Sequence, residues 1–198
     1  MSNDYHQPTI LFVDTSVSDY ESLLIGLSSN VEVHVLNSNQ DGILQIASIL
    51  QGRSDLRSIQ ILSHGSNGSI AIGETTLNNS NLSSYSVALQ RIGSSLSATG
   101  DILLYGCNVA KDESGLGFIT QLANLTGADV AASNNLTGFG GDWDLEVSKG
   151  IIENVSAVSK LATSQYKANW AMFGKIQVVA LSMNCLLVRQ LVGSLLGQ

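Results

Sequence analysis

Ile59-Gln60-Ile61-Leu62-Ser63-His64-Gly65 and Asp101-Ile102-Leu103-Leu104-Tyr105-Gly106-Cys107 are the two stretches that decide the fold. Each is a short apolar run of the kind that forms a buried strand, and each ends in small or polar residues. The first reactive side chains after the two runs are His64 and Cys107. Because a parallel sheet places its chemistry just past the carboxyl ends of its strands, the sequence predicts that these two side chains face each other there. A histidine beside a cysteine can act as the general base that converts the thiol to a nucleophilic thiolate.

The rest of the chain alternates between strand and helix patterns around these two runs. Strands are expected over residues 9–13, 31–36, 59–64, 101–107 and 129–132, and helices over residues 18–27, 41–50, 82–96 and 115–125. Small β-hairpins are expected within residues 68–77 and 138–153. This alternation predicts an α/β fold, a three-layer sandwich with a mainly parallel central sheet and right-handed crossovers.

Length and composition indicate one domain with short additions. The chain has 198 residues, of which 44% are hydrophobic and 13% charged, so a sizeable core is available. We divide it into an N-terminal arm (1–8), the α/β domain (9–155), a linker-like segment (156–170) and an apolar appendage (171–198). The net charge of −7 argues against binding of nucleic acid or an anionic membrane through the overall field.

The two ends of the chain bear on localisation. Residues 1–7 lack a basic region followed by a long apolar stretch, so no Sec-type signal peptide is predicted. We therefore expect either a cytoplasmic protein or one exported by a route that needs no N-terminal signal. Polar residues interrupt the apolar appendage at Gln177, Asn184 and Arg189, which argues against a membrane span.

The chemistry available at the two strand ends is nucleophilic catalysis. A thiolate attacks a carbonyl carbon when the thiol is deprotonated, the oxyanion is stabilised and the leaving group is protonated. His64 can move the protons, and the backbone N–H groups of Gly65 and Cys107 are candidates for the oxyanion hole. The simpler interpretation is that Cys107 is a small buried hydrophobic residue, the commonest state of a free cysteine.

Ser63-His64-Gly65 and Tyr105-Gly106-Cys107, each after an apolar strand, resemble the pattern of the caspase-like (clan CD) cysteine peptidases. A longer set that also includes Gly140-Gly141-Asp142-Trp143-Asp144-Leu145-Glu146 looks closer to one uncharacterised domain. That domain occurs near the N-termini of very large bacterial, often cyanobacterial, surface or secreted proteins with calcium-binding or cadherin-like repeats. The resemblance covers roughly residues 9 to 165.

The resemblance implies a cysteine endopeptidase that acts on a protein or peptide, its own polypeptide among them, outside the cell or at its surface. Asp14, Ser133 and Asn134 would then line the substrate pocket, although an aspartate before Thr15-Ser16 also suits a turn or helix cap. No cofactor is required and no metal site is predicted. Some members of the resembled clan need calcium, so the resemblance makes calcium a candidate activator of this protein.

Two other functions compete with the peptidase. The first is a catalytically silent caspase-like module for protein–protein docking, adhesion or export, which the acidic, Ser- and Asn-rich surface fits as well. The second is a flavodoxin-like nucleotide or phosphate binder, which the sequence disfavours because no GxGxxG or GxxxxGK[ST] motif follows a strand. The alternating acids at Asp142, Asp144 and Glu146 could bind calcium, but their spacing is also that of one solvated strand face.

Overall fold

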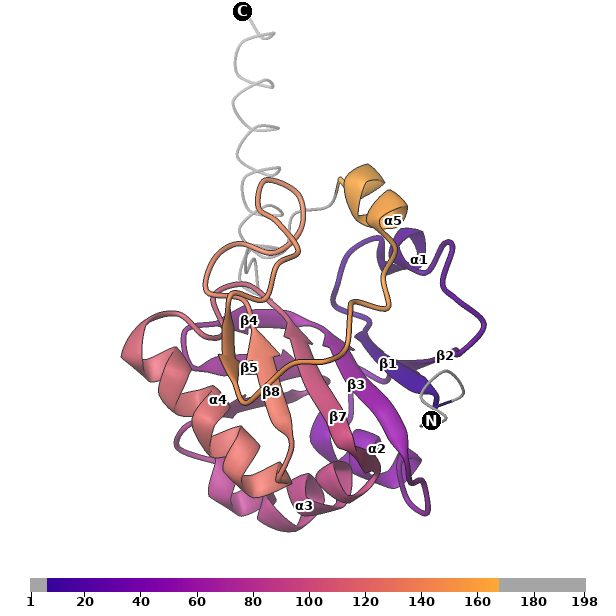
Figure 1. Ribbon diagram of the computed structural model, residues 1–198. Helices are drawn as coiled ribbons and strands as arrows, with labels where there is room; N and C mark the ends of the chain where they lie inside the picture. The colour runs from indigo at the N-terminus through magenta and orange to yellow at the C-terminus, as the bar shows by residue number, and fades with distance from the viewer. Residues whose placement is uncertain (1–6, 168–198) are drawn as a thin grey trace, which may run out of the picture.

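A mainly parallel six-stranded sheet forms the centre of the computed structural model, which describes residues 7–167 (Figure 1). Its strands are β1 (Thr9–Asp14), β2 (Val31–Leu36), β3 (Leu56–Leu62), β7 (Leu96–Tyr105), β8 (Asp129–Ala132) and β9 (Val147–Lys149). The strand order is β2-β1-β3-β7-β8-β9, and only β9 runs antiparallel to its neighbour. The predicted α/β class with a mainly parallel sheet is thus confirmed.

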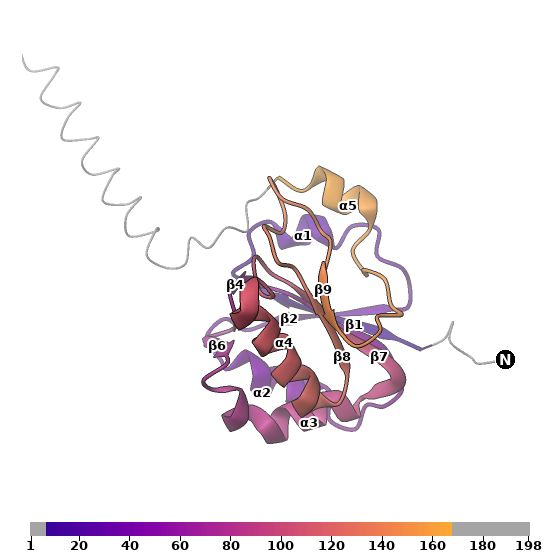
Figure 2. The same ribbon diagram turned by 60° about the vertical axis from the view of Figure 1, so that its left-hand side comes forward.

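Helices cover both faces of this sheet and complete the three layers (Figure 2). The helical elements are α1 (Tyr20–Leu23), α2 (Gly42–Ile49), the 3-10 helix η2 (Leu82–Tyr85), α3 (Ser86–Ser94), α4 (Asp112–Thr126) and α5 (Lys160–Gln165). Buried residues of α2, α3 and α4 form one apolar core with one face of the sheet. Leu23 of α1 and Ala162 of α5 belong to a second core on the other face, so the sheet separates two cores.

A small antiparallel sheet follows β3 at the carboxyl edge of the large one. It consists of β4 (His64–Ser66), β5 (Ser69–Ile72) and β6 (Thr75–Asn78). The pairing of Ile72 with Thr75 leaves Gly73 and Glu74 as the turn, which confirms the hairpin expected within residues 68–77. Gly73 has φ +62°, and a Cβ there would lie 2.1 Å from the carbonyl oxygen of Gln40.

Two predicted elements differ from the structure for backbone reasons. The helix expected over 18–27 is reduced to the single turn α1, because Asp19 (φ 54°) and Gly26 (φ 76°) take left-handed conformations on either side of it. The hairpin expected within 138–153 does not form, because β9 pairs antiparallel with β8 instead. Gly150 (φ +96°) ends that strand, and residues 151–156 continue without regular structure.

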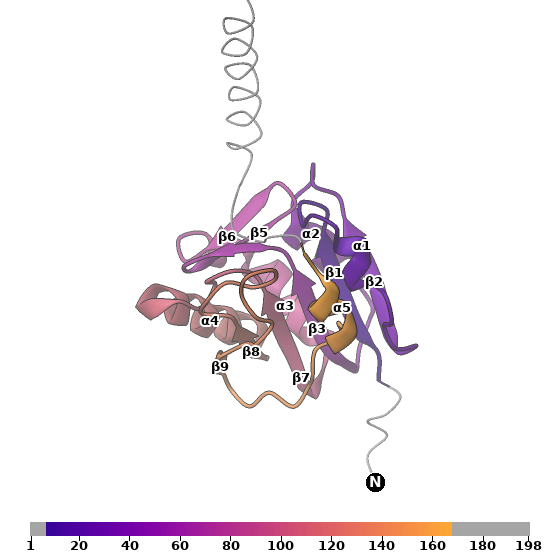
Figure 3. The same ribbon diagram turned by 90° about the horizontal axis from the view of Figure 1, so that it is seen from above.

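The segment predicted as linker-like, 156–170, is part of the domain as far as the structure describes it. Val158, Ala162 and Tyr166 are buried in the second core, and the Ser159 hydroxyl caps α5 by accepting from Ala162 N at 3.1 Å. α5 lies beside α1 over one end of the sheet (Figure 3). Residues 168–170 and the predicted appendage 171–198 lie outside the described residues. Within 7–167, no helix combines the length and apolar character needed to cross a bilayer.

Replacing Tyr166 by alanine is expected to destabilise the domain by about 3–5 kcal/mol, the range for loss of a buried aromatic side chain. Tyr166 is 2% exposed, packs edge-on against Trp143 and donates from its hydroxyl to Ser18 O at 2.5 Å. Tyr166→Phe keeps the ring and is expected to cost about 1 kcal/mol. Urea unfolding measures both. An unchanged midpoint for Tyr166→Ala would mean that the segment is a true linker.

Candidate active site at the strand ends

The two reactive residues follow neighbouring strands of the large sheet. β3 and β7 are paired in parallel up to Leu62 opposite Tyr105, and Ser63 N extends the ladder by donating to Tyr105 O at 3.0 Å. His64 and Cys107 each come two residues after the last paired position of their strand. The structure therefore places both at the carboxyl edge of the sheet, on adjacent strand ends.

Two glycines allow the main chains of these strand ends to touch. A Cβ on Gly65 would lie 2.9 Å from the carbonyl oxygen of Cys107 and 2.4 Å from Cγ2 of Val109. A Cβ on Gly106 would lie 3.0 Å from the carbonyl oxygen of Ser63 and 3.2 Å from Gly65 N. A side chain at position 65 would force the neighbouring main chain to shift, and one at position 106 would need its neighbours to move by a few tenths of an ångström. The two strand ends therefore pack closely because both residues are glycine.

Cys107 faces the side of the sheet that α1 and α5 cover, and His64 contacts the loop that leads into α1. Cys107 belongs to the second core. The imidazole Nε2 of His64 lies 3.1 Å from the carbonyl oxygen of Ser16, and the next residue, Val17, belongs to that same core. His64 is partly exposed, whereas Cys107 is only 2% exposed. The imidazole is thus open to solvent while the thiol is covered.

The cover over Cys107 is the backbone of Thr137. Cys107 Sγ lies 3.4 Å from Thr137 N and 3.7 Å from Thr137 O, so the sulfur can accept from one atom and donate to the other. Burial raises the pKa of the Cys107 thiol, although the backbone N–H groups of Thr137 and of Cys107 itself act in the opposite direction. In this arrangement the sulfur is held as a thiol, which is the unreactive form.

Thr137 belongs to a covering loop, residues 133–146, that Asn135 holds in place. Asn135 O accepts from Asn108 N at 2.7 Å. The Asn135 side-chain amide donates to Asp142 Oδ2 at 2.9 Å and to Glu146 Oε1. Asp142 and Glu146 therefore act as hydrogen-bond acceptors within the loop. None of the three acids around Trp143 belongs to a three-carboxylate group in the described part of the chain. Sequence reasoning missed Asn135, because no periodic pattern marks a loop contact.

The three predicted pocket residues lie at the same edge of the sheet, and the side chains of Asp14 and Ser133 have structural partners. Asp14 is buried, and its carboxylate accepts from Ser16 N at 2.8 Å and from Gly73 N, which holds two turns in place. Ser133 is also buried, and its hydroxyl lies 3.2 Å from Asn135 Oδ1. Asn134 is exposed. Their role in substrate binding stays a prediction.

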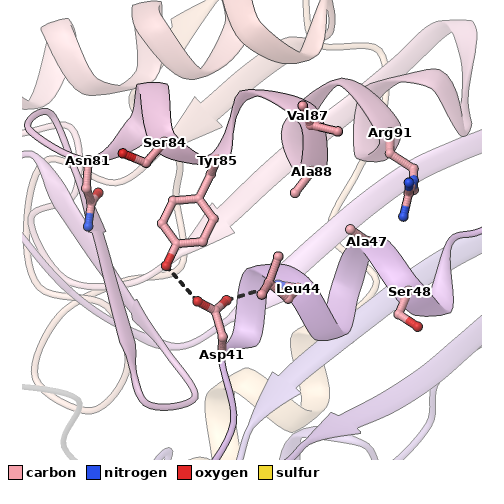
Figure 4. A pocket seen from close by; sticks show the side chains of 10 residues that line it. All are labelled: Asp41, Leu44, Ala47, Ser48, Asn81, Ser84, Tyr85, Val87, Ala88 and Arg91. Atoms are coloured by element: carbon pink, nitrogen blue, oxygen red, sulfur yellow. Dashed lines mark hydrogen bonds between the residues drawn. The ribbon is translucent and has the colours of Figure 1, made fainter.

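A wide groove on the other side of the sheet lies apart from these residues (Figure 4). It runs between α2 and the η2–α3 segment, with exposed Leu44 and Val87 along it. Tyr85 points across it and donates to Asp41 Oδ2 at 2.6 Å. Asp41 also caps α2 by accepting from Leu44 N at 3.0 Å. This groove includes neither His64 nor Cys107, and its polar contacts join the helices to each other.

Comparison with known proteins identifies a family but no activity. No curated protein matches this chain. Among solved structures, the crystal structure of a small-chain dehydrogenase matches with 13% identity and a TM-score of 0.34, over 61% of this chain and 77% of that one. A likeness of that size carries no argument about function. Residues 10–169 match a family over most of the chain. The chain therefore belongs to the family described as Domain of unknown function (DUF4347).

Proposed function

We propose that this domain is a caspase-like cysteine endopeptidase in which His64 and Cys107 form the catalytic dyad. The observation that supports it best is the contact of Gly65 with the main chain of Gly106 and Cys107, since it fixes both residues at adjacent strand ends. The same proposal is supported by the position of Cys107 in the core beneath α1 and α5 and by the contact of His64 with the loop before α1. The substrate is a protein or peptide, including this polypeptide itself, and the site of action is outside the cell or at its surface.

The proposed reaction uses only side chains and backbone groups of this edge. His64 removes the proton from Cys107 Sγ, and the thiolate attacks the carbonyl carbon of the scissile peptide bond. Backbone N–H groups of Gly65 and Cys107 donate to the oxyanion that forms. His64 then gives its proton to the departing amine, and a thioester to Cys107 remains. Water activated by His64 hydrolyses that thioester and restores the thiol.

In this proposal, Thr137 keeps the enzyme latent. The thiol is 2% exposed and its pKa is raised by burial, so the reaction requires the covering loop to move away from Sγ. Leu136 and Phe139 of that loop are partly exposed apolar side chains, which a protein substrate could contact. Opening would expose the thiol to both His64 and substrate.

Loosening the covering loop is expected to activate Cys107. Asn135→Ala removes the amide donors to Asp142 and Glu146. If these hydrogen bonds stabilise the closed loop by about 1.4 kcal/mol, their loss increases the population of the open loop about tenfold. We expect alkylation of Cys107 by iodoacetamide at pH 7.5, followed by mass spectrometry, to accelerate by that factor. Asn134→Ala is the matched control, because its side chain is exposed and only its backbone N–H contacts Glu146.

A second substitution in the loosened background tests the dyad itself. If His64 activates the thiol, the double variant Asn135→Ala/His64→Ala is not alkylated faster than wild type near neutral pH. Its alkylation rate then increases only as the pH approaches the ordinary pKa of a thiol, about 8.5. In the wild type with the loop closed, the raised pKa of Cys107 shifts the pH of half-maximal alkylation above that ordinary value. Equal pH profiles with and without His64 in the loosened background would refute the dyad.

The burial of Cys107 favours one competing function, a catalytically silent module for protein docking. A cysteine capped by the Thr137 backbone can be a packing residue and nothing more. For that function, loosening the loop speeds alkylation regardless of His64. The paired variants therefore distinguish the two functions.

A further inference from the structure

Three carboxylates, those of Asp101, Asp129 and Glu153, gather where β7 and β8 begin to pair. Figure 2 shows these two strands beside β9. Asp101 and Asp129 are the first residues of this parallel pairing and lie directly opposite each other. Glu153 belongs to the irregular segment that follows β9. One oxygen from each of the three carboxylates lies within 4.8 Å of the others. Like charges opposite each other in a sheet are destabilising, so a positive charge at this point would stabilise the domain.

Asp101 is the buried member of the group, and only one of its two oxygens is used by the protein. Its Oδ2 accepts from Glu153 N at 3.0 Å, Asn154 N at 2.9 Å and Asn154 Nδ2 at 2.7 Å. Its Oδ1 is buried without a hydrogen-bond partner in the described part of the chain, and the whole residue is 0% exposed. A buried carboxylate oxygen left without a partner is costly. That oxygen is therefore the one available to a ligand.

No cationic side chain in the described residues forms an ion pair with the three carboxylates. Within residues 7–167, the ion pairs closer than 4 Å are those of Glu32 with His34 and Arg53, in another part of the sheet. Asp129 instead accepts from the backbone of Ile151 at 2.9 Å, which fixes its orientation. The three carboxylates thus have a defined geometry and no partner of opposite charge in this range.

We propose that Asp101, Asp129 and Glu153 bind a calcium ion. Calcium takes oxygen ligands at 2.3–2.6 Å, so two ligand atoms on one ion can lie up to about 5 Å apart. The three oxygens all lie within 4.8 Å of one another, which is inside that limit. The ion would satisfy Asp101 Oδ1 and tie the segment after β9 to β7 and β8. Cys107 lies six residues beyond Asp101, about 20 Å along the strand direction, so this site is separate from the proposed dyad.

Titration of the full chain with calcium chloride by isothermal calorimetry tests the site. We expect wild type to bind one ion and Glu153→Gln to weaken that binding at least tenfold, because Glu153 is exposed and its substitution leaves the fold intact. Glu113→Gln removes the same charge from an exposed position on α4 and is expected to bind as wild type does. Asp129→Asn serves as a second ligand variant and is expected to weaken binding similarly.

The thermal unfolding midpoint gives an independent readout, since a ligand that binds only the folded state raises it. Calcium is expected to raise the midpoint of wild type and Glu113→Gln but not that of Glu153→Gln. No binding to wild type, or equal affinity for wild type, Glu153→Gln and Asp129→Asn, would overturn the proposal. Neither outcome depends on the reactivity of Cys107.

Discussion

Self-cleavage of the full-length chain is expected to stop when Cys107 is replaced by alanine, because no other group would supply the thiolate that attacks the peptide bond. The measurement is intact-mass analysis of purified chain over time, in the Asn135→Ala background, where the covering loop no longer holds the thiol shut. His64→Ala in the same background is expected to slow cleavage by roughly 10²–10⁴, the usual contribution of a general acid–base. New fragments should accumulate only where both residues are present.

Cys185→Ala is the matched control for this experiment, because it removes the only other thiol in the chain by the same substitution. It is expected to cleave at the rate of its parent. Fragments that form at an unchanged rate in Cys107→Ala would show that another nucleophile or another protease cuts the chain. If Asn135→Ala itself produces no fragments, a panel of peptide substrates replaces the chain, and inactivity toward all of them would favour the docking module.

The strands and the site edge could be predicted because buried parallel strands are apolar runs. The carboxyl ends of such runs must meet at one edge, so His64 and Cys107 are placed together by topology alone. The packing role of Gly65 and Gly106 could not be predicted in this way, because the sequence does not show which main-chain atoms come close to each other. The structure adds the close approach of their main chains.

Features that depend on loops or on register could not be predicted in the same way. The cover over Cys107 depends on Asn135, whose partners lie 7 and 11 residues further along an irregular loop. The pairing of Asp101 with Asp129 requires the register of β7 against β8, which an apolar pattern does not fix. One missed element did leave a signal. Val158, Ala162 and Tyr166 recur every four residues in a polar segment, a spacing typical of a helix, and α5 forms between the first and the last of them.

Replacing Gly65 by alanine is expected to disrupt the site through packing, without changing any chemical group. The new Cβ would lie 2.9 Å from Cys107 O and 2.4 Å from Val109 Cγ2, and the backbone oxygen cannot rotate away. Overpacking of this kind costs about 1–3 kcal/mol, so the urea unfolding midpoint should fall clearly. Because the strain acts on the Cys107 backbone, proteolysis and dyad-dependent alkylation should be lost even where the protein stays folded.

Gly117→Ala provides the matched control, since it adds the same methyl group to the same domain. Gly117 is exposed in the middle of α4, and a Cβ there has no heavy atom within 4 Å. Alanine is the better helix former, so this variant is expected to gain about 0.5–1 kcal/mol and keep the alkylation rate of wild type. The difference between the two variants measures the contact between strand ends. If Gly65→Ala and Gly117→Ala had equal stability and equal Cys107 reactivity, the two strand ends would not touch, and the dyad would lose its geometric support.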